Sequence, residues 1–332
     1  MKAMVTGANG FLGRAICRAW AAHGEPVKAV YRDSVNRKDI FDHLDIEIVD
    51  DTQPNSQKCV GADVVIHCAA RTHVLREFPK RPLDEIRRIN RDAAVDLARA
   101  AAEVGVRRFI FLSSIHVAGD RSLGLPLRET DRPNPQEFYA LSKWEAEQSL
   151  LECGYASGLE IVILRLPLVH GPNPKGNLRK LLIAIDAEVL LPLGTVENRR
   201  SVLGIDNLCS AVWLAANSPN LGGRTYHLAD EGSISVREMV LVLASVLGKR
   251  PRLIAVPRWL AMAGGLLAGR RDQLRKLLDD LEVDASAFRL ATGWRPTVGL
   301  RDGLREMAES YARQSNPTTD NLGANAHKPD RA

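Results

Sequence analysis

Residues Thr6 to Gly13 read TGANGFLG, and this stretch decides the fold. It follows a short apolar segment at residues 2–6 and precedes an amphipathic run, RAICRAWAAHG. Strand, glycine turn and helix in this order predict a dinucleotide-binding unit. Gly7 would permit the tight turn, Gly10 would let the backbone approach a pyrophosphate at the helix N-terminus, and Gly13 would let the helix pack closely on the strand.

The second apolar segment, PVKAVY, bears on which dinucleotide fits. It ends at Tyr31, and Arg32 follows directly. An acidic residue at this place would hydrogen-bond the adenosine ribose hydroxyls, whereas a guanidinium can pair with a 2′-phosphate. The sequence therefore favours NADP(H). The alternative is NAD(H), with Asp33 on the ribose and Arg32 in solvent.

A second motif, FYALSKWE, places Tyr139 and Lys143 four residues apart at the start of a predicted amphipathic helix. Residues at i and i+4 share a helix face, so the ammonium can lie beside the phenol. A nearby cation favours phenolate, and a bound, positively charged nicotinamide would add to this effect, so we expect a lowered pKa for Tyr139. The pair indicates proton transfer coupled to hydride transfer. Alone, it also fits a packed tyrosine and a solvated lysine.

Composition excludes several other classes of protein. The chain has 332 residues, 45% of them hydrophobic, and a net charge of +5 with dispersed basic residues, so it predicts a large core and no nucleic-acid groove. No metal site is expected. A glycine turn at residue 7 leaves no room for a secretory leader, and no apolar run reaches 18 residues. The five cysteines are widely spaced without a CxxC, which favours buried thiols in a reducing cytoplasm: Cys17, Cys59, Cys68, Cys153 and Cys209.

Five segments taken together resemble the extended short-chain dehydrogenase/reductase family in order and spacing. They are TGANGFLG, VVIHCAA (Val64 to Ala70), INRDAA with Asn90, FIFLSSIHVAG (Phe109 to Gly119) and YALSK from Tyr139. The resemblance covers roughly residues 2–313. It implies an α/β fold, a Rossmann-like doubly wound parallel sheet with a smaller α/β C-terminal substrate lobe.

The domain division follows from that resemblance. Residues 1–165 are expected to form the dinucleotide-binding domain, with later return segments at about 202–230. Residues 166–313 are expected to form mainly the substrate lobe. The tail at 314–332 is polar and lacks periodicity, which predicts disorder.

The resemblance also implies a role for each site residue. Ser114 would hydrogen-bond the substrate oxygen, Tyr139 would transfer the proton, and Lys143 would lower the tyrosine pKa and hold the nicotinamide ribose. The expected cofactor-binding residues are Gly7, Gly10, Phe11, Leu12, Gly13, Arg32, Asp50, Asp51, Ala69, Ala70, Asn90, Tyr139 and Lys143. The expected substrate contacts are Ser113, Ser114, Tyr139, Asn177 and Arg200.

Arg200 falls on the diphosphate-binding arginine of a family motif of the form RDFIYVDD, with Asp206 and Asn207 at its acidic end. A guanidinium suits a diphosphate. A surface arginine beside a strand is the alternative for Arg200.

Departures from the family motifs reduce the number of reactions that this chain could catalyse. Nucleotide-sugar dehydratases carry Asp and Glu after the catalytic Ser or Thr, but here Ile115 and His116 stand there, which argues against dehydration. His116 could titrate near neutrality or be structural. In galactose epimerases an asparagine follows the strand that leaves the nucleotide lobe, and Leu168 takes that place.

The strings RTHVL, NRDAA, SSIHV, KGNLRKLL and NRRSV resemble one branch of the family. That branch reduces UDP-2-acetamido-2,6-dideoxy-4-hexulose to UDP-N-acetylquinovosamine in O-antigen (lipopolysaccharide) synthesis, and its members also carry the name UDP-glucose 4-epimerase. We therefore expect an NAD(P)H-dependent 4-keto reductase. A UDP-glucose or UDP-N-acetylglucosamine 4-epimerase that retains NAD is the alternative, and a non-catalytic dinucleotide sensor is the second.

Two expectations concern partners. The resemblance implies a homodimer that forms through two helices. The apolar stretch PRWLAMAGGLLAG (Pro257 to Gly269), with the basic residues that follow to position 276, could dock on a membrane interface but is too short to span. A helix packed at the substrate lobe or at a dimer surface is the preferred interpretation of this stretch.

Overall fold

The computed structural model describes residues 1–31, 41, 44, 46–71, 82–257, 260 and 271–315. Several sequence predictions fall outside these residues and are not addressed by the structure. They concern Arg32, Asp33, residues 72–75 of RTHVL, nearly all of the apolar stretch at 257–269, and the tail from residue 316.

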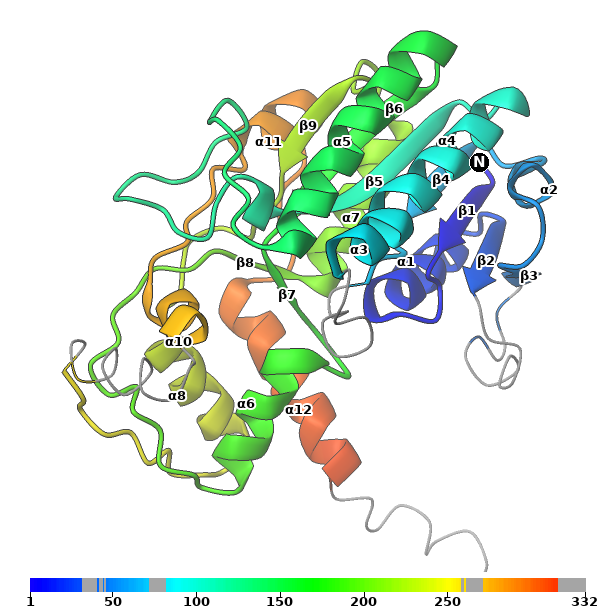
Figure 1. Ribbon diagram of the computed structural model, residues 1–332. Coiled ribbons are helices and arrows are strands. Elements are labelled where there is room, and N and C mark those ends of the chain that lie inside the picture. Colours follow the sequence, from blue (N-terminus) through cyan, green and yellow to red (C-terminus); the bar gives the residue numbers. More distant parts are fainter. Residues whose placement is uncertain are drawn as a thin grey trace, which may run out of the picture.

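A seven-stranded parallel sheet forms the centre of the molecule, in the order β3-β2-β1-β4-β5-β6-β9 (Figure 1). Its strands are β1 (Ala3–Thr6), β2 (Val27–Tyr31), β3 (Ile46–Asp50), β4 (Val64–His67), β5 (Arg108–Ser114), β6 (Glu160–Leu166) and β9 (Arg224–His227). The chain runs outward from β1 to β3 and then restarts on the other side of β1 with β4. This reversal is the switch point at which doubly wound folds bind ligands, and it confirms the predicted fold class.

Helices cover both faces of the sheet. The helices α1 (Phe11–Ala22) and α7 (Ile205–Asn217) pack on one face, and α2 (Asn55–Cys59), α4 (Ala93–Glu103) and α5 (Phe138–Ser157) pack on the other. The strand β1 shows why both faces close: Ala3 and Val5 enter one core and Met4 enters the other. Strands buried on both faces need mainly apolar residues, as β1 (AMVT) and β4 (VVIH) have.

A smaller lobe lies beyond the carboxyl edge of the sheet (Figure 1). It contains α6 (Gly176–Asp186), α8 (Val236–Val246), α10 (Arg271–Leu278), α12 (Leu300–Ser315) and a parallel pair of short strands, β7 (Leu168–His170) and β8 (Val202–Gly204). The helices α6, α8 and α12 share one apolar core. Between β8 and α8 the chain returns to the large sheet as α7 and β9. The chain therefore crosses between the two lobes more than once.

The C-terminal part of the chain also contacts the nucleotide lobe. The helix α11 (Ser286–Thr292) packs on β9, where Phe288 meets the rings of Tyr226 and Trp294 edge to face. At the junction of the lobes, Asp230 accepts hydrogen bonds from the Gly204 N–H at 2.9 Å and from Asn207 Nδ2 at 2.8 Å. These buried polar contacts fix the smaller lobe against the sheet edge. In the part of the chain that the structure describes, no helix is both long and apolar enough to cross a bilayer.

Candidate active site

The glycine turn between β1 and α1 leaves no space for side chains. Gly7 has a φ of +64°, and a Cβ there would lie 3.0 Å from the Ala69 Cα and N atoms. A Cβ on Gly13 would lie 2.4 Å from the Gly7 carbonyl oxygen, so the helix packs on the turn itself. The N-cap of α1 is Gly10, which offers no side chain to the first helical N–H groups. Phe11 and Leu12, the first residues of α1, follow this turn, and their backbone N–H groups belong to the helix N-terminus, where a phosphate would bind.

The turn after β4 touches the glycine turn. Ala69 N donates to Thr6 Oγ1 at 3.4 Å, and its neighbour Ala70 continues along the same edge. Asn90, fully buried on a π-helical turn (Arg88–Asp92) between α3 (Pro82–Arg87) and α4, supports this segment. Its Oδ1 accepts from Arg71 N at 2.8 Å.

The Asn90 amide has no hydrogen left for a ligand. Its Nδ2 donates to Arg71 O at 3.0 Å and to Ser142 Oγ at 3.1 Å. The cofactor contact that the sequence predicted for Asn90 stays a prediction; in the structure its amide group bonds Arg71 and Ser142. It ties the loop after β4 to the turn of α5 that carries Tyr139.

Asp50 and Asp51 lie at the carboxyl end of β3, next to the end of β2. Asp50 Oδ1 accepts from Thr52 N at 2.9 Å and from Thr52 Oγ1 at 2.8 Å, and Asp51 pairs with Lys58 at 3.0 Å. Both carboxylates are thus held at the edge where an adenine and its ribose would lie in a doubly wound fold.

The three predicted catalytic residues belong to two elements that pack together, β5 and α5. Ser114 is the last residue of β5, and its Oγ accepts from the His116 N–H at 3.3 Å, which caps a 3₁₀ turn at Ile115–Val117. Tyr139 is the second residue of α5, which packs against both β5 and that turn. Lys143 follows one helical turn later on the same face.

Lys143 is the most unusual group of the site. It is 1% exposed, and its Nζ has no hydrogen-bond partner within the described residues. The ammonium lies 3.7 Å from the centroid of the Phe111 ring. Burial lowers the pKa of Lys143 to about 7, against the opposing influence of Glu147 and Cys68. Such an orphaned buried donor is the property expected of a side chain that holds a ligand.

The pKa of Tyr139 departs from the sequence prediction. Burial raises it to about 12, whereas the motif predicted a lowered value. The chain's own groups therefore do not activate the phenol, because desolvation of the phenolate dominates. A charged Lys143 and a bound nicotinamide would have to reverse this effect.

Ser113 does not share the surroundings of Ser114, because successive strand residues point to opposite faces. Its hydroxyl donates to Glu147 Oε1 in the buried layer beneath α5. Glu147 also pairs with Arg165 of β6 at 2.6 Å. The predicted substrate contact by Ser113 is therefore replaced by a contact within the core.

Sequence reasoning missed Glu147 and Arg165, although each carried a signal. Glu147 lies four residues after Lys143, on the same helix face, and Arg165 interrupts an otherwise apolar strand, IVILRL. A charge placed within a buried element usually has a buried partner.

The two predicted residues of the substrate lobe differ in availability. Asn177 is the second residue of α6 and is exposed. Arg200 is partly buried, and its Nη1 donates to the carbonyl oxygens of Lys276 at 2.5 Å and Asp279 at 3.1 Å. Burial lowers the pKa of Arg200, although three nearby aspartates oppose this. At least part of this guanidinium holds the end of α10.

A cleft of about 670 Å³ separates the loop after β5 from α10. Lys276 of α10 crosses it, pairing with Asp120 at 3.2 Å and with Glu137, the N-cap of α5, at 2.8 Å. The His116 Nδ1 lies 2.7 Å from Asp120. Burial would raise the pKa of Asp120, but its bonds to His116 and Lys276 outweigh this and hold the value below the usual range.

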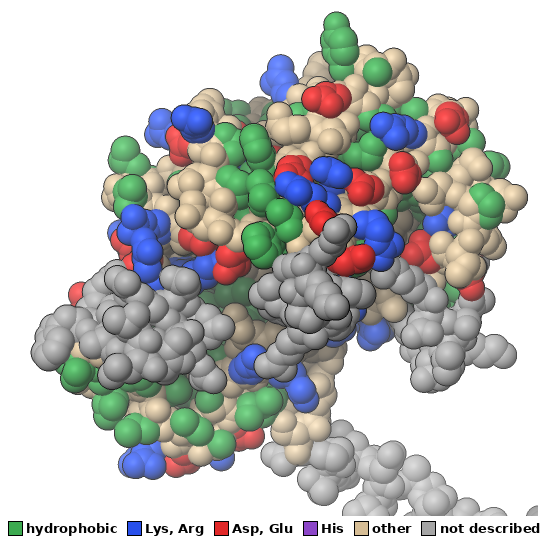
Figure 2. Space-filling model, viewed as in Figure 1, with side chains coloured by type: hydrophobic (Ala, Val, Ile, Leu, Met, Phe, Trp, Pro, Cys, Tyr) green, Lys and Arg blue, Asp and Glu red, His purple; other side chains and the backbone are tan. Residues whose placement is uncertain are grey.

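Charges of both signs are interspersed on the face of the molecule shown in Figure 2. Ion pairs are found among the charged residues of the molecule, including Arg87 with Glu145 and Arg91 with Glu145. In the described ranges, no three His, Cys, Asp or Glu side chains are grouped to hold a metal ion.

Comparison with known proteins identifies the family of this chain and several relatives. The model of the NAD dependent epimerase/dehydratase family matches residues 3–229. A UDP-glucose 4-epimerase of Vibrio cholerae is 33% identical over 318 residues, covering 94% of this chain and 96% of that protein. A GDP-6-deoxy-D-mannose reductase of Pseudomonas aeruginosa is 26% identical over 325 residues, covering 92% and 96%.

Among solved structures, the UDP-glucose 4-epimerase of Thermotoga maritima with UDP-glucose superposes with a TM-score of 0.77 at 19% identity. The match covers 95% of this chain and 100% of that one. The likeness extends over both lobes of the fold. The family match and the Vibrio cholerae relative lead to one conclusion: the chain belongs to the NAD dependent epimerase/dehydratase family of short-chain dehydrogenases/reductases.

Proposed function

We propose that the protein reduces the C4 keto group of a UDP-linked 4-keto-6-deoxy-N-acetylhexosamine, using NAD(P)H, to give UDP-N-acetylquinovosamine. The observation that carries this proposal is the buried Lys143 ammonium, which lacks a hydrogen-bond partner among the residues described and lies one turn from Tyr139. An unpartnered buried cation costs free energy, and the ribose hydroxyls of a dinucleotide would satisfy it.

The described residues fit such a cofactor. The glycine turn would receive the pyrophosphate, and Asp50 and Asp51 lie where the adenosine would bind. NADP(H) is the form we propose, because of Arg32. When bound, the dinucleotide supplies the hydride.

The chain's own residues would transfer the proton to the substrate. The Ser114 hydroxyl donates to the substrate carbonyl oxygen, and the Tyr139 phenol gives its proton to that oxygen as C4 accepts the hydride. A proton from solvent restores the phenol. The Lys143 ammonium stabilises the tyrosinate that forms in between.

The surroundings of Ser114 support reduction over elimination of water. Ile115 is a buried hydrocarbon, and His116 is engaged by Asp120, so neither offers the carboxyl pair of a dehydratase. Leu168, at the start of β7, is 40% exposed and presents a hydrocarbon where galactose epimerases carry an amide. For the UDP moiety we propose contacts from Asn177 and from the remaining N–H groups of Arg200.

A UDP-glucose or UDP-N-acetylglucosamine 4-epimerase is the second candidate. The observation that favours it is the 33% identity to a Vibrio cholerae protein of that name. Ser114, Tyr139 and Lys143 would then first remove a proton from the C4 hydroxyl and later return it. NAD would have to stay bound through the cycle.

One experiment separates the candidates. The purified protein is examined for co-purifying dinucleotide, and then offered UDP-N-acetylglucosamine without added cofactor and the 4-keto-6-deoxy sugar with NADPH or NADH. We expect oxidation of reduced dinucleotide with the keto sugar only. Cofactor-free interconversion of the UDP-sugar would establish the epimerase instead, and dinucleotide binding with no turnover would indicate a sensor.

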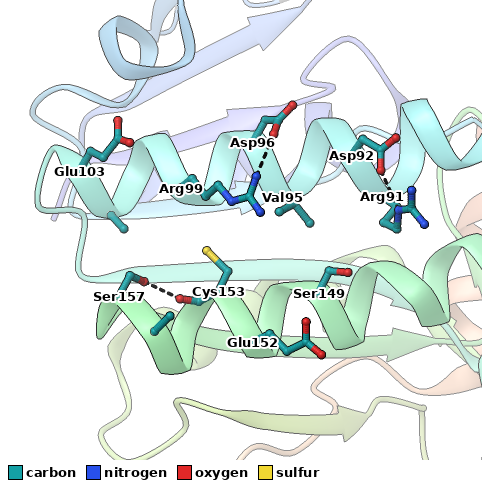
Figure 3. Close-up of a pocket in the computed structure, with 12 residues that line it drawn as sticks. Arg91, Asp92, Val95, Asp96, Arg99, Glu103, Ser149, Glu152, Cys153 and Ser157 are labelled. Atoms are coloured by element: carbon teal, nitrogen blue, oxygen red, sulfur yellow. Dashed lines mark hydrogen bonds and ion pairs between the residues drawn. The ribbon is translucent and has the colours of Figure 1, made fainter.

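We further propose a homodimer that forms through α4 and α5. A groove of about 790 Å³ runs between these helices, and Figure 3 shows Cys153 and Val95 turned toward it. Its rim carries both signs of charge, including Arg99 and Glu152. A second copy related by a two-fold axis meets the same surface, so a self-complementary charge pattern suits it.

The mass in solution tests this assembly. By light scattering we expect twice the 36.5 kDa of one chain, and a monomer for Ala156→Arg, which places a cation in the groove. Leu290→Arg is the control, because Leu290 is exposed on α11, away from the groove. A wild-type monomer, or an Ala156→Arg dimer, would contradict the proposal.

A further inference from the structure

Beneath the catalytic lysine lies a carboxylate that the proposed chemistry does not use. Glu147 is fully buried on α5, one turn after Lys143. Its Oε2 accepts from Arg165 Nη2 at 2.6 Å, its Oε1 lies 3.1 Å from Arg165 Nε, and Ser113 donates to Oε1. Three donors from β5 and β6 therefore fix the carboxylate in one orientation.

Glu147 supplies the negative charge that offsets the buried cations between α5 and the sheet. It is flanked by two buried cations, Lys143 on its own helix and Arg165 on β6. Arg165 is hydrogen-bonded to the Glu147 carboxylate. Lys143 is not, so the carboxylate acts on it only by electrostatic attraction at a distance. Removal of the carboxylate would leave two cations in a region from which water is excluded, and Lys143 is the one that can lose its charge.

Other elements packed here add little negative charge near Lys143. From β4 come His67, stacked on Phe111, and Cys68, and the pKa of His67 falls to about 3 through burial, so its ring is neutral. From β9 comes His227, whose pKa falls to about 4 for the same reason. Glu129 lies toward Arg165 and bonds the His227 N–H at 2.7 Å. Glu147, one helical turn after Lys143 on the same face, is thus the carboxylate that acts on the lysine.

We infer that Glu147 is a positioning residue for the reaction: held by Arg165 and Ser113, its carboxylate keeps Lys143 in the ammonium form. The inference rests on the proposed function, since the ammonium matters there as the partner of Tyr139 and the dinucleotide. Glu147 touches neither substrate nor cofactor. It acts through Lys143 alone.

The test compares Glu147→Gln with Glu145→Gln. Both changes remove one carboxylate from α5, but Glu145 faces Arg87 at the surface. For wild type, kcat/KM should fall at alkaline pH as Lys143 loses its proton. In Glu147→Gln we expect this alkaline limb to move to lower pH by about one unit, so that the rate falls roughly tenfold on the alkaline side.

Glu145→Gln should leave the limb in place. A Glu147→Gln profile that drops uniformly at every pH, or keeps the wild-type limb, would overturn the inference and leave Glu147 a structural residue. Glu147→Asp retains the charge, so its alkaline limb should stay within a few tenths of a pH unit of wild type even if its melting temperature falls.

Glu147→Gln could fail to fold, because it leaves Arg165 buried without its anion. The double variant Glu147→Gln with Arg165→Met removes both charges of the pair, an exchange that folded proteins tolerate. It should show the same downward move of the limb. A wild-type limb in the folded double variant would equally overturn the inference.

A measurement without turnover separates this inference from the proposed function. In protein labelled with ¹³C-lysine, the Cε resonance of Lys143 is assigned by its loss in Lys143→Met and followed with pH. Its titration should move to lower pH in Glu147→Gln and stay unchanged in Glu145→Gln. An unmoved titration would refute the role of Glu147, whatever reaction the enzyme catalyses.

Discussion

Lys143 and Arg200 are two cations that the sequence predicted to be functional, and the structure uses them differently. Lys143 has no hydrogen-bond partner in the described structure and is buried against the Phe111 ring. Arg200 donates to the carbonyl oxygens of Lys276 and Asp279 at the end of α10. In the nucleotide lobe the charge is left without a hydrogen bond, whereas in the substrate lobe it is bonded to the backbone at the end of α10.

The difference teaches that burial alone does not identify a binding residue. A buried cation that the chain satisfies itself stabilises the protein, and its loss should cost stability. A buried cation left without a partner costs stability, and its loss should cost function while the fold gains. Substitutions at the two positions should therefore have opposite effects on unfolding.

The largest effect should follow Lys143→Met. We expect kcat/KM to fall by about 10²–10⁴-fold, because the ammonium that stabilises tyrosinate is lost. At pH 7 the free energy of unfolding should rise by about 1–3 kcal/mol, since an unpartnered buried charge is replaced by a hydrocarbon of similar length. Urea melts and steady-state assays measure both quantities. A variant that is less stable than wild type would show that the contact with the Phe111 ring outweighs the cost of burying the charge.

The pH dependence of that stability difference sharpens the comparison. The pKa of Lys143 falls from 10.5 to about 7 on folding, so between these values only the unfolded chain binds the proton. Wild-type stability from this group therefore rises with pH across that window. The advantage of Lys143→Met should be greatest below pH 7 and vanish near pH 10.5. Urea melts at half-unit steps would reveal a constant difference if Lys143 were not desolvated.

Arg200→Met should act in the opposite direction. We expect the free energy of unfolding to fall by about 1–3 kcal/mol, because two carbonyl groups at the end of α10 lose their donor. Arg199→Met is the matched control: its side chain is 67% exposed, and its loss should change stability by less than about 0.5 kcal/mol. Equal stability of the two variants would mean that Arg200 is free to bind a diphosphate.

The smallest effect should come from Lys276→Met. Lys276 joins Asp120 to Glu137 across the cleft, but Glu137 is 59% exposed. We expect a loss of less than about 1 kcal/mol, and a smaller one at high salt, because solvent screens the pairs. A large loss of stability in thermal melts that does not depend on salt would show that these ion pairs are shielded from solvent in the folded protein.

Much of the nucleotide lobe could be predicted because its signals are local. The glycine turn needs only neighbouring residues, and β1, β2 and β4 are short, mainly apolar runs. Tyr139 and Lys143 lie one turn apart in any helix. These features depend little on the rest of the chain, so the sequence alone located them.

The remaining features depend on contacts between distant segments. The predicted amphipathic helix at residue 138 is a helix, but its buried face carries Ser142, Lys143 and Glu147, which no hydrophobic pattern anticipates. Glu147 meets Arg165 only because β5 and β6 pair in parallel register beneath α5. Arg200 donates to the carbonyl oxygen of Lys276 in α10, which lies 76 residues later in the sequence. Pairings of this kind are set by tertiary packing.

Replacement of Tyr139 by Phe tests the central claim most directly, because it removes only the oxygen that transfers the proton. Dinucleotide binding is measured by fluorescence titration, and turnover is measured with the 4-keto sugar and with the UDP-sugar. We predict dinucleotide affinity within about threefold of wild type and a loss of turnover of about 10²-fold or more. Turnover equal to wild type would contradict the claim that Tyr139, beside Lys143, is the proton-transferring group.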